Sequence, residues 1–140
     1  MRLIFLDVDG VLNKSHGKDE FDPLMMKNLK HIVDSSGSEI VISSDWRRSG
    51  ANLARLRSEL MSYGMNFIDT TPIMNGERRK REIASWLRSN QGWDKAVILD
   101  DLDTAHLYKR NKIIFIQTDH KLGLTEEDAD KAINFFHKEK

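Results

Sequence analysis

Five short apolar runs divide the chain, and segments with helical spacing lie between them. The runs cover Arg2 to Val8, Glu39 to Ser43, Asn66 to Asp69, Lys95 to Leu99 and Lys112 to Ile116. Their apolar residues are continuous rather than alternating, as expected for strands that are covered on both faces. Strands that alternate with helices form a parallel sheet. The sequence therefore predicts an α/β protein with a doubly wound, three-layer, Rossmann-like fold around a five-stranded parallel sheet.

The spacing of apolar residues also predicts the helices. They cover Pro23 to Ser35, Ala51 to Tyr63, Lys80 to Arg88, a short segment from Thr104 to Tyr108, and a last helix that begins after Thr125. Thr125 is a suitable N-cap because acidic residues follow it in the first turn. One helix and short turns account for the chain between strands, apart from Val11 to Asp22. We therefore expect residues 1–140 to form a single domain.

Composition restricts the possible environment and chemistry. The 140 residues are 39% hydrophobic and 31% charged, which is typical of a soluble globular protein, and the net charge is zero. The absence of cysteine excludes disulfides and thiolate chemistry. No apolar stretch is long enough for a signal peptide or a membrane span. We expect a cytoplasmic protein that has no membrane partner.

Polar residues follow three of the predicted strands where each strand ends: Asp7, Asp9, Gly10, Ser43, Ser44, Arg47, Asp100 and Asp101. The carboxyl ends of parallel strands share one edge of the sheet, and ligands bind there. Asp7 and Asp9 point the same way while the chain stays extended, and Gly10 permits a sharp turn after them. The sequence therefore predicts that acids and hydroxyls converge at this edge.

Such a cluster suits magnesium and phosphate. Converging carboxylates would repel one another unless a hard divalent cation lay between them, and an oxygen cage of this kind suits Mg²⁺. Ser43, Ser44 and nearby backbone N–H groups can hold phosphate oxygens. Lys80 can supply the remaining positive charge, with Arg79 and Arg81 as alternatives. Asp101 can equally serve as an N-cap. We interpret the cluster as a phosphoryl-transfer site.

The order of these residues resembles the haloacid dehalogenase (HAD) superfamily. The resemblance spans about residues 3 to 101, and its most specific part is the apolar run followed by Asp7-Val8-Asp9-Gly10-Val11-Leu12-Asn13. Shorter stretches resemble the HAD domains of RNA-repair proteins and of polynucleotide kinase-phosphatases: Ser44 to Arg47, Lys80 to Ile83 with Trp86, and Thr118 to Thr125.

The resemblance implies roles for the clustered residues. Asp7 would be the nucleophile that forms an aspartyl-phosphate, Asp9 the general acid and base, and Ser43 and Lys80 the phosphoryl-binding groups. Mg²⁺ would be bound by Asp7, the Asp9 backbone carbonyl, Asp100 and Asp101. Gly10, Ser44 and Arg47 would contact the substrate. An acid at position 9 favours a phosphatase over a dehalogenase. Thr104 stands where many relatives carry a further acid.

The substrate class is less restricted. Only Val11 to Asp22 is long enough to serve as a flap, so without a cap domain the open site would admit a bulky phosphate monoester such as a nucleic-acid end. Residues 45–88 hold nine Lys or Arg against five Asp or Glu, and this excess would attract nucleic acid. The alternatives are a nucleotide or small-metabolite phosphatase, and a non-catalytic module that binds phosphate or a metal. The oligomeric state is left open.

Overall fold

A five-stranded parallel sheet forms the centre of the protein, whose computed structural model describes residues 1–14, 20–76, 78–102 and 112–138. Its strands are β1 (Arg2–Leu6), β2 (Glu39–Ile42), β3 (Phe67–Thr70), β4 (Lys95–Asp100) and β5 (Ile113–Gln117). The strand order is β3-β2-β1-β4-β5, and every neighbouring pair is parallel. The chain therefore reverses its direction of travel across the sheet between β1 and β4, where such folds bind their ligands.

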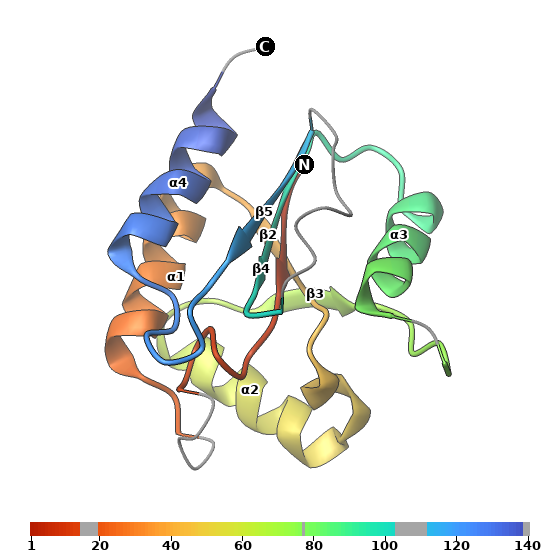
Figure 1. The fold of residues 1–140 in the computed structure, drawn as a ribbon, viewed down its shortest axis with the longest axis horizontal. Coiled ribbons are helices and arrows are strands. Elements are labelled where there is room, and N and C mark those ends of the chain that lie inside the picture. Colours follow the sequence, from red (N-terminus) through yellow and green to blue (C-terminus); the bar gives the residue numbers. More distant parts are fainter. Residues whose placement is uncertain (15–19, 77, 103–111, 139–140) are drawn as a thin grey trace.

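Helices cover both faces of this sheet. They are α1 (Pro23–Ser36), α2 (Gly50–Ser62), α3 (Arg79–Ser89) and α4 (Glu126–His137), with a short 3₁₀ helix, η1 (Asp45–Arg48), after β2. The helices α1 and α4 lie together on one side of the sheet, and α3 lies on the other (Figure 1). The predicted three-layer α/β fold is confirmed, and the described residues include no cap domain.

The strands contribute to two apolar cores. Ile4 and Leu6 of β1 pack with residues of α1, α2 and α4, whereas Leu3 and Phe5 pack with residues of α3. All four side chains are fully buried, which explains why the run is continuous. The sequence predicts that every strand is covered on both faces of the sheet, and this prediction is wrong for β3. It is an edge strand, and Ile68 is 51% exposed.

Local sequence signals set most helix boundaries. Asp22 caps α1 by accepting from two backbone N–H groups of the first turn, and Gly37 ends this helix with a φ of 66°. The predicted N-cap Thr125 is confirmed, because it forms a capping box with Asp128. The predicted helix from Thr104 to Tyr108 lies outside the described residues. No helix in the described part of the chain is both long and apolar enough to cross a membrane.

Candidate active site

Three polar residues lie on one rung at the carboxyl edge of the sheet. Leu6 of β1 pairs in register with the last residue of β2 and with Leu99 of β4. The Asp7 N–H donates to the Leu99 carbonyl at 3.0 Å, and the Ser43 N–H donates to the Leu6 carbonyl at 3.0 Å. Asp7, Ser43 and Asp100 therefore end three neighbouring strands at the same level.

Successive side chains of a strand point to opposite faces of the sheet, and this alternation puts the side chains of the rung on the face that α3 covers. Phe5 and Ile98 belong to the core on the α3 side of the sheet. Asp7 and Asp100 each follow two residues later, so their side chains leave the sheet on the same side. Ser43 has the same phase on β2. The rung thus faces the layer formed by α3, rather than the layer formed by α1 and α4.

Asp7, Asp100 and Asp101 form a compact carboxylate cluster. One oxygen of each lies within 4.8 Å of the other two. Burial, and next the charge of Asp100, raise the pKa of Asp7 well above its ordinary value; burial and Asp100 also raise the pKa of Asp101. The three carboxyl groups are too close together to ionise easily unless a positive charge lies between them. Their oxygen atoms are the ligands that a hard divalent cation prefers, so these three residues can hold Mg²⁺.

Gly10 allows the loop after β1 to pass against this cluster. Its φ is +79°, and a Cβ added at this position would overlap the Asp101 carboxylate. The Thr118 hydroxyl, which follows β5, donates to the Gly10 carbonyl at 2.7 Å. The sequence predicts substrate contact for Gly10, and the structure shows close packing of its backbone against Asp101.

Replacing Gly10 with alanine is expected to weaken Mg²⁺ binding at least about tenfold and to destabilise the protein by about 1–3 kcal/mol. The new methyl group would displace the Asp101 carboxylate and strain a backbone with positive φ. Calorimetric titration with Mg²⁺ and thermal melting measure the two effects. Gly76→Ala is the matched control, since Gly76 also has a positive φ but a Cβ added there would meet no described atom within 4 Å. Equal effects on Mg²⁺ affinity in both variants would contradict the packing argument.

Asp9 is exposed, and two donors fix its carboxylate. Asn13 Nδ2 donates to one oxygen at 3.0 Å, and Trp46 Nε1 donates to the other at 3.2 Å. Among the described residues, the Asp9 side chain does not belong to the cluster of Asp7, Asp100 and Asp101. Its predicted metal contact through the backbone carbonyl stays a prediction. The carboxylate is left accessible and oriented, as a proton-transfer group requires.

Ser43 and Ser44 have different surroundings. The Ser43 hydroxyl is fully buried and has no hydrogen-bond partner in the described part of the structure. Ser44 is the N-cap of η1, and its hydroxyl accepts from the Trp46 N–H at 3.1 Å. An unpaired buried hydroxyl costs about 1–3 kcal/mol. Ser43 is therefore the buried hydroxyl that a ligand would satisfy, whereas the Ser44 oxygen already accepts from the backbone.

Arg79 supplies the positive charge that the sequence assigns to Lys80. Its Nη1 lies 2.6 Å from Asp100 Oδ2 and 3.4 Å from Asp7 Oδ2. Burial disfavours the charged form, but Asp7 and Asp100 outweigh it and raise the pKa of Arg79. Lys80, the next residue on α3, lines a groove outside this cluster. The alternative Arg79 is thus the residue that the fold brings to the carboxylates.

Arg47 lies at the predicted edge of the sheet, but its side chain does not face an open site. Its guanidinium is buried and donates to the carbonyls of Ser43, Ser44, Thr71 and Pro72 at 2.9–3.2 Å. It also pairs with Glu82 of α3 at 2.7 Å. These contacts use the donor groups of the side chain. The predicted role in substrate binding is therefore replaced by a structural one, in which Arg47 joins the ends of β2 and β3 to the first turns of α3.

The sequence gives Arg79 only as an alternative to Lys80 and gives Trp46 no role, and a periodic signal existed for only the first of them. Ile83 and Trp86 are buried on the inner side of α3. Arg79 precedes them by four and seven residues, so helical periodicity puts it on that inner side. Trp46 offered no comparable signal, because its contact with Asp9 joins segments 37 residues apart.

Comparison with known proteins gives a family match. Residues 3–129 match the family described as the HAD domain in Swiss Army Knife RNA repair proteins. The chain matches no curated protein at a significant level. It also matches no solved structure at a significant level. The family match covers β1 to the start of α4 and therefore includes every residue of the carboxylate cluster.

Proposed function

Because the chain belongs to the family of HAD domains in Swiss Army Knife RNA repair proteins, we propose that it is a Mg²⁺-dependent phosphatase of phosphate monoesters. The observation that carries this proposal is the rung of Asp7, Ser43 and Asp100, with Arg79 bridging its two acids. A carboxylate nucleophile and a hydroxyl without a partner end neighbouring strands on this rung, and the Arg79 guanidinium contacts its two acids. This combination serves the transfer of a phosphoryl group better than any redox or acyl chemistry.

Asp7 acts as the nucleophile. A carboxylate oxygen attacks phosphorus, the bond to the leaving oxygen breaks, and an aspartyl-phosphate forms on Asp7. The charge of Arg79 favours the ionised form of Asp7 against the effect of burial. Arg79 also offers donors to the phosphoryl oxygens, and the Ser43 hydroxyl gains an acceptor from the same group. Both contacts stabilise the charge that develops during transfer.

Asp9 moves the protons. Its carboxyl group gives a proton to the leaving oxygen in the first step and takes one from the attacking water in the second. Water then displaces Asp7, which releases inorganic phosphate and restores the free carboxylate. Asn13 and Trp46 hold Asp9 for both steps. When bound to Asp7, Asp100, Asp101 and the Asp9 carbonyl, Mg²⁺ would neutralise charge on the phosphoryl group.

A nucleic-acid terminal phosphate is the favoured substrate. The description of the matched family refers to RNA repair, and the site has no cap domain in the described residues. An open edge admits a chain end, which an enclosed cavity would exclude.

The function is tested by hydrolysis of p-nitrophenyl phosphate with and without Mg²⁺. The substrate class is tested by a panel of 3′- and 5′-phosphorylated DNA and RNA oligonucleotides beside nucleotides and sugar phosphates. We expect Mg²⁺-dependent turnover and the highest kcat/KM for an oligonucleotide. Preference for a free metabolite would replace the favoured substrate, and binding of Mg²⁺ without turnover of any substrate would indicate a non-catalytic module.

Replacing Asp9 with asparagine is expected to separate the two chemical steps. Loss of the proton donor should slow the turnover of a phosphorylated oligonucleotide by about 10²–10⁴-fold, because its sugar hydroxyl is a poor leaving group. p-Nitrophenolate leaves without a proton, so only the second step should slow. Rapid mixing should then show a burst of one p-nitrophenol per protein. Trp46→Phe, which removes one donor to Asp9, should act in the same direction but less strongly. Equal loss on both substrates without a burst would contradict the role of Asp9.

A further inference from the structure

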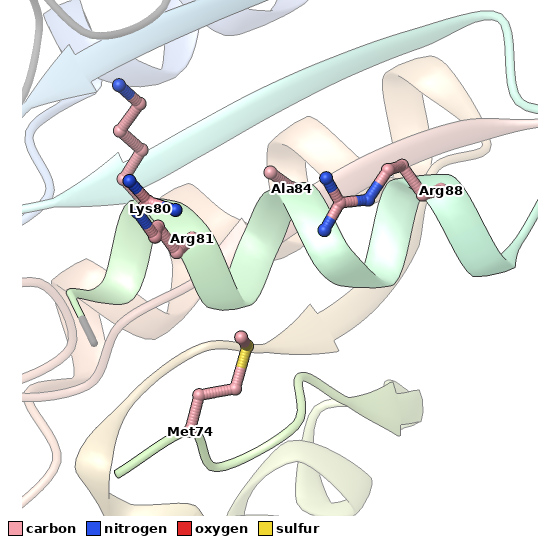
Figure 2. Close-up of a pocket in the computed structure, with 5 residues that line it drawn as sticks. All are labelled: Met74, Lys80, Arg81, Ala84 and Arg88. Atoms are coloured by element: carbon pink, nitrogen blue, oxygen red, sulfur yellow. The ribbon is translucent and has the colours of Figure 1, made fainter. Parts of the chain in front are cut away.

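A groove lies along the outer surface of α3, the helix whose first residue, Arg79, contacts the carboxylate cluster. Its volume is about 220 Å³. Four lining residues come from α3 and one from the segment after β3: Met74, Lys80, Arg81, Ala84 and Arg88 (Figure 2). We call it the α3 groove. None of its lining residues has a part in the chemistry proposed above.

Cations and apolar atoms share this groove. Met74 points from its loop toward the helix, and the Arg88 guanidinium turns back along the helix toward Ala84 (Figure 2). Arg81 and Arg88 are exposed, whereas Met74 and Ala84 are partly buried. Among the described residues, the lining holds three basic side chains and no acid. The groove thus combines an apolar floor with a positively charged rim on a protein of zero net charge.

The helix that lines the groove also reaches the carboxylate cluster with its first residue. Lys80 directly follows Arg79, which contacts Asp7 and Asp100. A helix rises 1.5 Å per residue, so Arg81 and Arg88 are roughly 10 Å apart along the axis of α3. A ligand whose terminal phosphate lies at Asp7 would therefore find basic side chains along a line that leads away from the site.

The size and chemistry of the groove indicate the class of ligand. A volume of about 220 Å³ is smaller than the roughly 300–1,000 Å³ of sites that enclose a small molecule. It suits part of a longer ligand that runs across the surface. Single-stranded nucleic acid offers both an anionic backbone and flat apolar bases, which match the rim and the floor.

We propose that the α3 groove binds the single-stranded nucleic-acid segment adjacent to the terminal phosphate. This inference rests on the proposed function, because it assigns the body of the substrate whose phosphate reacts at Asp7. Arg81 and Arg88 bind the phosphodiester backbone, and Met74 contacts a base. The groove contributes affinity for the strand and does not take part in the chemical steps.

The test uses a fluorescent single-stranded RNA decamer without a terminal phosphate, bound to the wild type and to Arg81→Gln/Arg88→Gln. Fluorescence anisotropy at several salt concentrations measures the Kd. Loss of two phosphate contacts should weaken binding on the order of tenfold at low salt. It should also reduce the slope of log affinity against log salt by about 1.4, since each contact to a single strand contributes about 0.7. Turnover of p-nitrophenyl phosphate should not change.

Lys27→Gln/Lys131→Gln is the matched control, because it removes two exposed charges from α1 and α4 on the opposite layer. An unchanged Kd in the groove variant, or an equal loss in the control, would overturn the proposal. A third result would also overturn the proposal: the wild type binds a poly-glutamate decamer as tightly as the RNA, and the groove variant loses this binding. The groove would then bind acidic peptides. Failure of the proposed function is distinguishable, since it would abolish p-nitrophenyl phosphate turnover in the wild type without altering RNA binding.

Discussion

Replacing Asp7 with asparagine is expected to lower kcat for p-nitrophenyl phosphate by about 10³-fold or more while the protein stays folded. The amide has nearly the same shape as the carboxylate, but it cannot attack phosphorus. Phosphate release measured under saturating Mg²⁺ and substrate gives kcat. No aspartyl-phosphate should be trapped by acid quenching of the variant.

We also expect that Asp7→Asn does not destabilise the folded protein. Burial and the charge of Asp100 raise the pKa of Asp7, so its ionised form is disfavoured in the folded state relative to the unfolded one. This cost is absent below the ordinary carboxyl pKa and develops as the pH rises above it. At neutral pH and without Mg²⁺, the asparagine variant should therefore be at least as stable as the wild type in thermal melting.

Asp45→Asn is the matched control for both measurements. Asp45 also contacts Arg79, at 3.7 Å, but its side chain is 72% exposed. Loss of this surface charge should change kcat and stability little. If Asp7→Asn kept more than a few per cent of the wild-type turnover, the nucleophile would have to be reassigned. If Asp45→Asn lost as much turnover as Asp7→Asn, the effect would be one of local charge.

Replacing Arg47 with methionine is expected to cost about 3–5 kcal/mol of the free energy of unfolding. The substitution would leave the Glu82 carboxylate, whose side chain is 3% exposed, without its ion-pair partner. It would also remove the guanidinium donors from four carbonyls at the ends of β2 and β3. Such a loss is a large part of the roughly 5–15 kcal/mol that stabilises a typical domain. Denaturant unfolding at neutral pH measures it.

The neighbouring Arg48 provides a control of the same residue type. Arg48 is exposed and contacts only the exposed Asp45 among the described ion-pair partners, at 3.3 Å. Arg48→Met should therefore cost less than about 1 kcal/mol. Arg47→Lys should be intermediate, because an ammonium keeps the charge but cannot reach the same set of acceptors. Similar losses in the Arg47 and Arg48 methionine variants would show that the buried pair does not fix α3 to the sheet.

Arg47 also affects the active site indirectly. Glu82 lies three residues after Arg79 on α3, so the pair that fixes Glu82 also fixes the turn that presents Arg79 to Asp7. The Glu82 carboxylate additionally accepts from the Met74 N–H at 2.9 Å, which holds the segment that lines the α3 groove. One buried ion pair therefore supports both the charged site and the neighbouring groove.

The sequence alone determined the edge of the sheet at which the site lies. Continuous apolar runs predicted buried parallel strands, and the polar residues that end them had to meet at one edge because parallel strands share their direction. This argument brings Asp7, Asp9, Ser43, Ser44, Asp100 and Asp101 to one edge, and the register of the strands puts Asp7, Ser43 and Asp100 on the same rung. It requires only the ends of the strands, which are local properties of the chain.

Only the tertiary structure decided which basic side chain contacts the acids of the rung and which one has a structural role. Lys80 and Arg79 are adjacent on a helix, so their directions differ by about 100°, and the packing of α3 on the sheet brings Arg79 to the acids. Arg47 follows a strand like a ligand-binding residue, yet its buried partners come from the ends of β2 and β3 and from α3. Contacts between segments far apart in the chain leave no periodic pattern in the sequence, and the three-dimensional fold alone determines them.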